Sequence, residues 1–95
     1  MVQILFSNII GDIYKQEADE GNTLLYKDAI SCYRGAIKLS NGTVTDPDLY
    51  YVLGSSLLNN GQYNEAAESL RTSMSLQPNN SHVLNNLGVA YFHLN

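Results

Sequence analysis

The two histidines are the side chains best suited to bind a metal ion or transfer a proton. His82 and His93 lie eleven residues apart in a stretch with helical periodicity. A helix rises 1.5 Å per residue, so they would be about 16 Å apart along its axis and could not share one metal ion. We therefore predict surface histidines, with contact to a binding partner as the alternative, and no metal site.

Two other features have the composition of a reactive or ligand-binding site. Glu17, Asp19 and Glu20 precede a Gly-Asn pair, but the alternating ligands and distal glutamate of a calcium loop are missing. A solvated helix end is the prediction. Cys32, the only cysteine, forms neither a disulfide within the chain nor a zinc site. It is predicted to be a small helix residue, because a reactive thiol needs a basic neighbourhood.

Catalytic machinery is not recognisable in the sequence. There is no pairing of a nucleophile with a base, no glycine-rich phosphate loop and no cluster of metal ligands. The serines considered as nucleophiles fall within helical patterns, namely Ser55, Ser56 and Ser69. We predict that the protein is not an enzyme and needs no cofactor.

Charge and hydropathy narrow the classes of partner. The 95 residues carry a net charge of −4, with a pI near 4.8 and five scattered basic residues. A phosphate backbone would be repelled, so nucleic acid is not an expected partner. The apolar N-terminal stretch reaches Asp12 too soon to span a bilayer, and it lacks a cleavage site typical of signal peptides. We expect no membrane partner and a cytoplasmic location.

Helical patterns repeat along the chain. Residues 50–57 and 84–91 align without gaps at an offset of 34. In both, a large apolar residue is followed by Leu at +3, Gly at +4 and another large residue at +7, which is one stripe of a helix. Between them, Gly61 suits a helix end, and residues 63–76 have helical periodicity. Pro78 disfavours helix before it, and Asn80 or Ser81 can cap the next helix.

This pattern resembles the tetratricopeptide repeat. Residues 47–80 carry the family's motif positions as Tyr50, Leu53, Gly54, Leu57, Ala66, Leu70 and Pro78. Gly61, Tyr63 and Glu65 also fall where the family commonly has these residues. The departures, at Leu57, Leu70 and Ser73, preserve large or small size. The resemblance implies an all-α fold, an α-solenoid of antiparallel helix hairpins with about five helices and two and a half repeats. We expect one domain over residues 1–95.

The spacing has a physical explanation. Two antiparallel helices pack closely where each carries almost no side chain, and Gly54 and Ala66 would form that contact. The space beside it would be filled by Tyr50, Leu53 and Leu57 against Tyr63 and Leu70. The tyrosines at such positions are expected to be core residues, and they are Tyr14, Tyr33, Tyr50, Tyr63 and Tyr91.

The two ends are irregular. Residues 1–41 form a degenerate repeat, carrying first-helix positions Ile10, Gly11 and Tyr14 and second-helix positions Tyr26, Ala29, Tyr33 and Ala36. Tyr14 to Tyr26 spans 12 residues where Leu57 to Tyr63 spans 6, which predicts a longer first helix and a loop around residues 21–23. A second small insertion falls within residues 41–48, with Asp46 as cap and Pro47 at the first helical position.

The third repeat has only its first helix, residues 81–95. Its packing stripe is expected to be exposed, and it comprises Leu84, Leu87, Gly88 and Tyr91. Either the chain is a fragment of a longer array, or the stripe is buried by rearrangement or against a second copy.

The resemblance also implies a partner-binding concave face lined by first helices. Its predicted residues are Asp48, Tyr51, Val52, Ser55, Leu58, Asn59, His82, Asn85, Asn86, Val89, Phe92 and His93. In the first repeat they are Asn8, Ile9, Asp12, Lys15 and Gln16. Such a face would hold an apolar or amphipathic segment. The alternative is that the apolar members pack against neighbouring helices.

The sequence is compatible with three functions. The first is a scaffold that binds a peptide or helix of another protein on the concave face. The second is self-association through residues 81–95. The third is a regulatory fragment of a larger protein. The family's basic clamp for chaperone tails is not reproduced, because Asp12, Val52, His82 and Asn86 stand where it needs Asn, Asn, Lys and Arg. Binding of chaperone tails is therefore not predicted.

Overall fold

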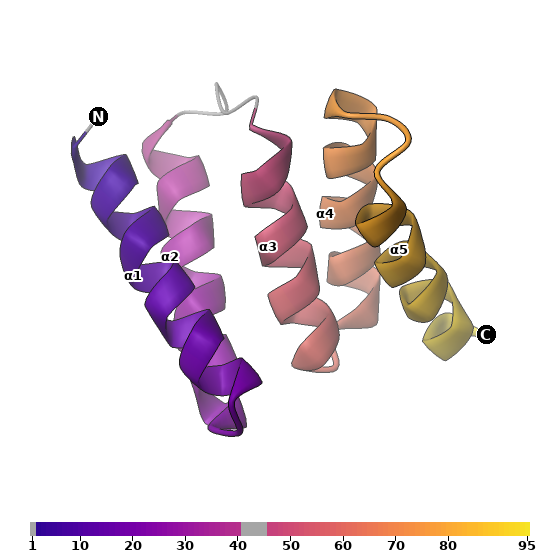
Figure 1. Cartoon of the computed structure of the whole chain (residues 1–95), viewed down its shortest axis with the longest axis horizontal. Helices are drawn as coiled ribbons and strands as arrows, with labels where there is room; N and C mark the ends of the chain where they lie inside the picture. Colours follow the sequence, from indigo (N-terminus) through magenta and orange to yellow (C-terminus); the bar gives the residue numbers. More distant parts are fainter. Residues whose placement is uncertain (1, 41–45) are drawn as a thin grey trace. The chain divides into compact units, whose positions relative to one another are not determined.

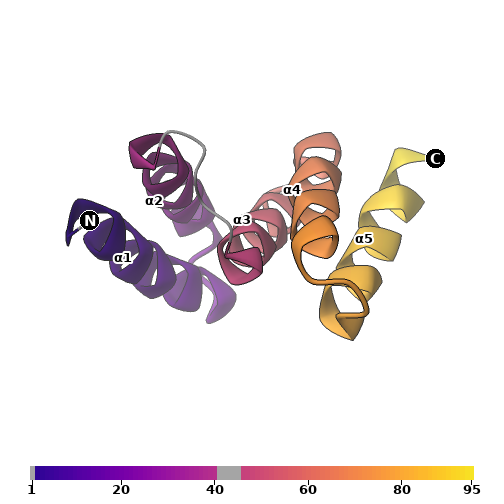
Figure 2. The same ribbon diagram turned by 90° about the horizontal axis from the view of Figure 1, so that it is seen from above.

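The chain is all-α, as expected from the repeat pattern. A computed structural model describes residues 2–40 and 46–95, and within them it contains no strand. The helices are α1 (Val2–Asp19), the short 3-10 helix η1 (Thr23–Leu25), α2 (Tyr26–Leu39), α3 (Pro47–Asn59), α4 (Tyr63–Leu76) and α5 (Ser81–Leu94). Figures 1 and 2 show these helices from two directions.

The chain divides into two compact units, Met1–Val44 and Thr45–Asn95, called unit 1 and unit 2 below. Unit 1 is an antiparallel hairpin of α1 and α2 joined through η1. Unit 2 contains the hairpin of α3 and α4, with α5 packed against α4 (Figure 1). The expectation of a single domain over residues 1–95 stays a prediction.

The helix boundaries of unit 2 follow from local chemistry. Asp46 caps α3 by accepting a hydrogen bond from the Asp48 amide at 2.9 Å, and Pro47 occupies the first turn. Asn80 caps α5, its side-chain oxygen lying 3.0 Å from the His82 amide nitrogen. The sequence left Asn80 and Ser81 as alternative caps, and the structure selects Asn80.

The turns on either side of α4 also have identifiable causes. Gly61 adopts a φ of 81° between α3 and α4, a conformation that costs glycine little because it has no Cβ. At the other end, α4 stops at Leu76 and Gln77 is extended, with φ −141° and ψ 90°. Pro78 explains this, since proline disfavours helical backbone in the residue before it.

The insertion predicted in the first repeat is accommodated as a longer α1 of 18 residues followed by η1. The second insertion, expected within residues 41–48, lies largely outside the described residues. Close packing in this hairpin occurs at Gly11, where a Cβ would lie 2.8 Å from Cε1 of Tyr33. The predicted second-helix positions are all buried, namely Tyr26, Ala29, Tyr33 and Ala36.

Two tyrosine–carboxylate hydrogen bonds join α2 to α1. The Tyr33 hydroxyl donates to Oδ1 of Asp12 at 2.6 Å, and the Tyr26 hydroxyl donates to Oδ1 of Asp19 at 2.5 Å. Burial and the Asp12 carboxylate raise the pKa of Tyr33 far above its ordinary value, so this hydroxyl remains a donor. Each bond satisfies the one polar atom of a buried tyrosine ring.

The pKa of Asp19 predicts how the stability of unit 1 depends on pH. Burial raises this pKa, but hydrogen bonds from Tyr26 and Lys15 and the Lys15 charge outweigh burial and lower it below its ordinary value of 3.8. The contribution of the ionised carboxylate is therefore fully present above that value, and it is lost as the pH falls through the folded-state pKa. We expect Tyr26→Phe to cost roughly 1 kcal/mol at pH 6, and less at pH 3.

Thermal unfolding of the wild type and of Tyr26→Phe, followed by circular dichroism between pH 6 and pH 2.5, measures this effect. The difference in Tm should shrink as the pH falls. A difference that stayed constant to pH 2.5 would show that the hydroxyl contributes by packing and not through the carboxylate.

The hairpin of unit 2 is built on one close approach. A Cβ at Gly54 would lie 2.7 Å from Cγ of Leu70 and 3.4 Å from the carbonyl oxygen of Ala66. Ala66 and Leu70 have no exposed surface. Leu53 and Leu57 are buried beside this contact, whereas the aromatic neighbours Tyr50 and Tyr63 are half-buried.

Ser73 stands where the tetratricopeptide repeat that this sequence resembles usually has alanine, and its hydrogen bonding explains why a buried serine is tolerated there. Its side chain is 1% exposed, and a buried hydroxyl without a partner would be costly. The hydroxyl donates to the carbonyl oxygen of Pro47 at 2.9 Å. Pro47 opens α3, so this hydrogen bond ties the end of α4 to the start of α3.

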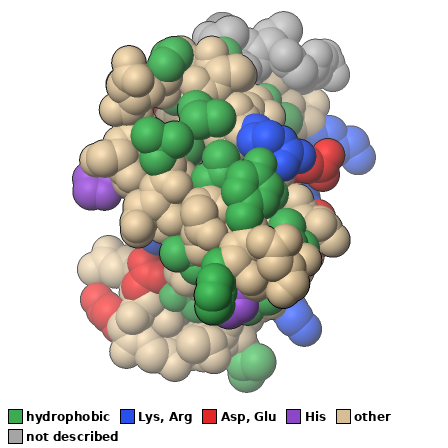
Figure 3. Space-filling model, turned by 90° about the vertical axis from the view of Figure 1, so that its right-hand side faces the viewer, with side chains coloured by type: hydrophobic (Ala, Val, Ile, Leu, Met, Phe, Trp, Pro, Cys, Tyr) green, Lys and Arg blue, Asp and Glu red, His purple; other side chains and the backbone are tan. Residues whose placement is uncertain are grey.

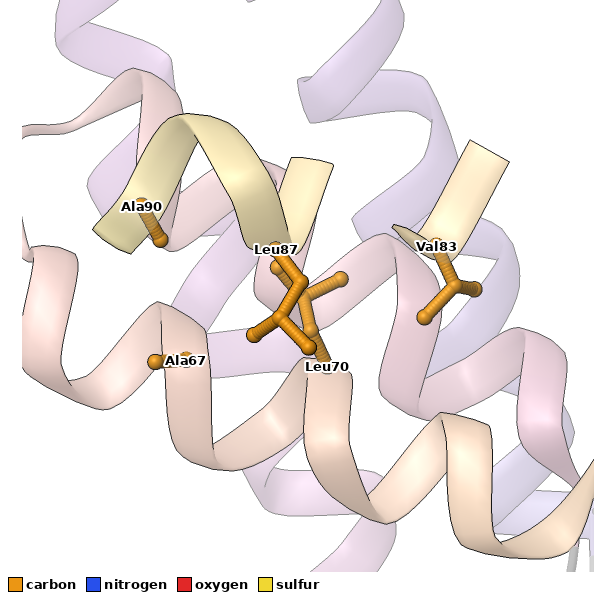
Figure 4. Close-up of a cluster of buried hydrophobic side chains, with 5 residues drawn as sticks. All are labelled: Ala67, Leu70, Val83, Leu87 and Ala90. Carbon is orange, nitrogen blue, oxygen red and sulfur yellow. The ribbon is translucent and has the colours of Figure 1, made fainter. Parts of the chain in front are cut away.

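Leu70 also belongs to the packing between α4 and α5. The buried cluster on that side is made of Ala67, Leu70, Val83, Leu87 and Ala90, and Figure 4 shows Leu87 and Leu70 meeting between the two helices. The expectation that Leu87 lies on an exposed stripe is therefore wrong, because its side chain is only 6% exposed. The Leu87 side chain on α5 faces α4. The equivalent Leu53 on α3 is likewise buried.

Candidate protein-interaction surface

Both histidines are exposed, as predicted, but His93 has a defined contact. Its ring stacks on Tyr63 with centroids 4.3 Å apart and planes within 7°, and the Phe92 ring meets it edge-on at 5.6 Å. This contact fastens the end of α5 to the start of α4. Among the described residues, no group of three or more His, Cys, Asp or Glu side chains is arranged to hold a metal ion.

Cys32 lies half-buried on α2. Burial and the nearby Asp28 carboxylate raise the pKa of its thiol. Both influences favour the protonated thiol, which is a weak nucleophile. The environment is therefore the opposite of the basic neighbourhood that a reactive cysteine requires.

The predicted concave face of α3 is used largely for packing. Tyr51 and Leu58 are partly buried against the cluster between α4 and α5, which is the alternative that the sequence left open for apolar members of this face. Ser55 is buried and Val52 is half-buried. On α3 the exposed members of the predicted set are Asp48 and Asn59.

The predicted concave residues of α5 are more accessible. Asn85, Val89 and Phe92 are all exposed, and their spacing of four and three residues places them on one face of the helix, called the Phe92 face below. Phe92 is 76% exposed. His82 and His93 are also exposed, and Asn86 is half-buried.

This face points away from the core. At 3.6 residues per turn, it lies opposite the buried stripe formed by Val83, Leu87 and Ala90. The α4 contacts therefore hold α5 in place while Phe92 is directed outward. An aromatic side chain with this exposure on an anchored helix is available to another molecule.

A second face of α5 is formed by Leu84, Gly88 and Tyr91. Leu84 and Tyr91 are 49% and 41% exposed, and beyond the adjacent residues and the backbone of α5 itself, no heavy atom lies within 4 Å of a Cβ placed at Gly88. Tyr91 was expected both among the core tyrosines and on the exposed stripe of the third repeat, and its exposure agrees with the second expectation. Its hydroxyl accepts a hydrogen bond from Nη1 of Arg71 at 3.0 Å. Figure 3 looks at the side of the molecule where α5 lies and shows hydrophobic side chains gathered there.

The sequence reasoning missed an apolar face on α1. Its exposed large side chains are Leu5, Phe6, Ile9, Ile10 and Ile13. The signal was available in the sequence, since these residues recur at helical spacing, but only Ile9 was assigned to a binding face. None of the helices described here is both long and apolar enough to cross a membrane.

Comparison with known proteins agrees with the geometry. A family model described as a TPR repeat matches residues 54–95, and no curated protein matches the chain. The matched segment begins at the close-approach glycine of α3 and includes all of α4 and α5. The hairpin of α3 and α4 and the 34-residue recurrence of its first-helix stripe in α5 are the features expected of that repeat. Residues 54–95 are therefore similar to the tetratricopeptide repeat in both sequence and helix arrangement.

Proposed function

We propose that the protein is a non-catalytic interaction scaffold whose Phe92 face binds a peptide or helix from another protein. The observation that carries this proposal is the 76% exposure of Phe92 on a helix fixed to α4 by its opposite face. Exposed aromatic side chains surrounded by polar groups are common anchors in protein interfaces.

The chemistry of the face favours an apolar or amphipathic segment. α5 contains no aspartate, glutamate, lysine or arginine, so an ion pair with this helix would not determine specificity. Phe92 and Val89 offer apolar surface. The Asn85 amide beside them has both a donor and an acceptor for the backbone of an extended or helical peptide.

Replacing Phe92 by glutamate tests this function, and Leu24→Glu is the matched control. Leu24 is also 76% exposed but lies on η1 in unit 1. We expect Phe92→Glu to lose the proteins that the wild type captures from a lysate, with at least about tenfold weaker binding of each purified partner. Leu24→Glu should retain them.

Circular dichroism of both variants is measured before capture is compared, and both are expected to remain folded. Equal capture by the wild type and Phe92→Glu would exclude the Phe92 face as the binding site. Loss of capture by both glutamate variants would indicate a general effect of charge and would equally contradict the proposal.

Self-association through residues 81–95 is the second candidate function, favoured by the exposed apolar side chains of α5. Light scattering over a range of concentrations distinguishes it, because a dimer would raise the mass as concentration increases. A regulatory role within a larger protein and a cytoplasmic location are compatible with a scaffold and remain proposals.

A further inference from the structure

The turn between α3 and α4 contains an Asn-Gly pair, Asn60 and Gly61. Asparagine is one of the thermally labile residues of proteins. It deamidates when the backbone nitrogen of the next residue attacks its side-chain carbon Cγ. Glycine is the most permissive next residue, because it has no Cβ to obstruct that approach. The geometry of the turn therefore decides whether this pair reacts.

The folded turn keeps the two reacting atoms apart. Asn60 has a ψ of 2°, which eclipses the Gly61 nitrogen with the backbone nitrogen of Asn60 and turns it away from Cβ. Ring closure requires the Gly61 nitrogen to lie on the side of Cβ, so the chain must rotate about the Asn60 Cα–C bond. Since α4 begins at Tyr63, two residues after Gly61, that rotation would pull α4 away from α3.

Hydrogen bonds hold the turn in the unreactive geometry. The Gly61 amide, whose nitrogen is the nucleophile, donates to the carbonyl oxygen of Leu58 at 3.1 Å. The Gln62 amide donates to that of Leu57 at 2.9 Å, as in helix ends closed by a left-handed glycine. Nδ2 of Asn60, the leaving group, donates to Oε1 of Gln62 at 2.7 Å. Both reacting groups are thus held in other interactions.

We propose that Asn60 is a deamidation site gated by the pairing of α3 with α4, blocked in the folded turn and open once the hairpin separates. The Gly61 nitrogen then forms a bond to Cγ of Asn60 and the Cγ–Nδ2 bond breaks. The proton of the Gly61 amide leaves with Nδ2 as ammonia. Water opens the resulting succinimide at either carbonyl group and yields aspartate or isoaspartate at position 60.

The isoaspartate product prevents the same turn from forming again. In isoaspartate the chain runs through the side-chain carbon, which adds a methylene group to the backbone between α3 and α4. The Gly61 and Gln62 amides then no longer reach the carbonyl groups of Leu58 and Leu57 together. A unit that reacts before it closes is therefore removed from the folded population, and the modification makes a transient opening of unit 2 permanent.

The rate of deamidation in the intact protein tests the gating. The protein and a peptide that copies residues 57–65 are incubated under the same mildly alkaline conditions. Tandem mass spectrometry of the tryptic fragment 39–71 separates Asn60 from the other Asn-Gly pair, at residues 41 and 42. We expect Asn60 to react at least about tenfold more slowly in the protein than in the peptide, because only the open fraction reacts.

A destabilised variant tests the same point within the intact chain. Leu70→Ala removes a fully buried side chain that packs over Gly54, so it raises the open fraction. We expect it to speed the reaction of Asn60 at least about tenfold. Leu76→Ala, at a position that is 39% exposed on the same helix, should leave the rate close to that of the wild type.

The effect on the fold is measured after ageing. The wild type is kept in urea until Asn60 is fully deamidated, and is then refolded. Asn60→Gln is the matched control, because its longer side chain must lose more rotational freedom to close a ring while the amide is kept. The aged wild type should unfold at a lower urea concentration than fresh protein, and aged Asn60→Gln should not.

Four results would overturn the proposal. They are equal rates in protein and peptide, a rate that Leu70→Ala leaves unchanged, an unaltered urea midpoint after ageing, and an equal loss in aged Asn60→Gln.

Discussion

Leu70→Ala is expected to destabilise unit 2 by about 2–5 kcal/mol, the range found for leucine-to-alanine changes in protein cores. Leu70 has no exposed surface, and it serves two contacts at once. Its side chain covers Gly54 on α3, and it belongs to the cluster with Val83 and Leu87 on α5. The truncation therefore leaves a cavity that adjoins both neighbouring helices.

Urea unfolding followed by circular dichroism measures the loss. A unit of this size has little free energy of unfolding to spare, so the variant should unfold at a markedly lower urea concentration. Leu76→Ala is the control, because Leu76 lies on the same helix and is 39% exposed. Losses of equal size in the two variants would show that Leu70 is not the central packing residue.

The features that the sequence predicted are those governed by local chemistry. The cap at Asp46, the stop before Pro78 and the turn at Gly61 each depend on a few neighbouring residues. The approach of α3 to α4 was predictable for a related reason, since a short turn forces adjacent helices to pair. A glycine and an alanine in register then mark where the two helices come closest.

The packing of α5 could be predicted only in part. Periodicity shows which residues share a face of a helix, but not which neighbour covers that face. Leu87 was assigned to an exposed stripe, yet its position at the border of two faces turns it toward α4. For the same reason, Tyr51 and Leu58 were assigned to a binding surface although they also pack against the cluster between α4 and α5.

Contacts between polar or aromatic side chains on different helices were missed. Tyr33 and Asp12 are separated by 21 residues, and Tyr63 and His93 by 30. Neither separation produces a periodic signal along the chain. They depend on the relative rotation of two packed helices, which is set by the whole core and becomes visible only in three dimensions.

Gly54→Leu is expected to destabilise unit 2 by about 1–3 kcal/mol or more, because the side chain would be forced into a filled space. The first added atom alone would lie 2.7 Å from Leu70 Cγ, and this neighbour is itself fully buried. The helices would have to separate, which would also loosen Leu57 beside the contact. A lower urea midpoint in chemical unfolding measures the effect.

Gly88→Leu is the matched control for Gly54→Leu within the same protein. It is the same substitution at the equivalent helical position, but no atom of another helix lies within 4 Å of the added Cβ. The gain in helix propensity of about 0.5–1 kcal/mol should therefore dominate. Combining Gly54→Leu with Leu70→Ala should recover part of the loss, because the leucine from α3 enters the space vacated on α4. If the two losses simply added, Gly54 and Leu70 would not share the contact on which the hairpin depends.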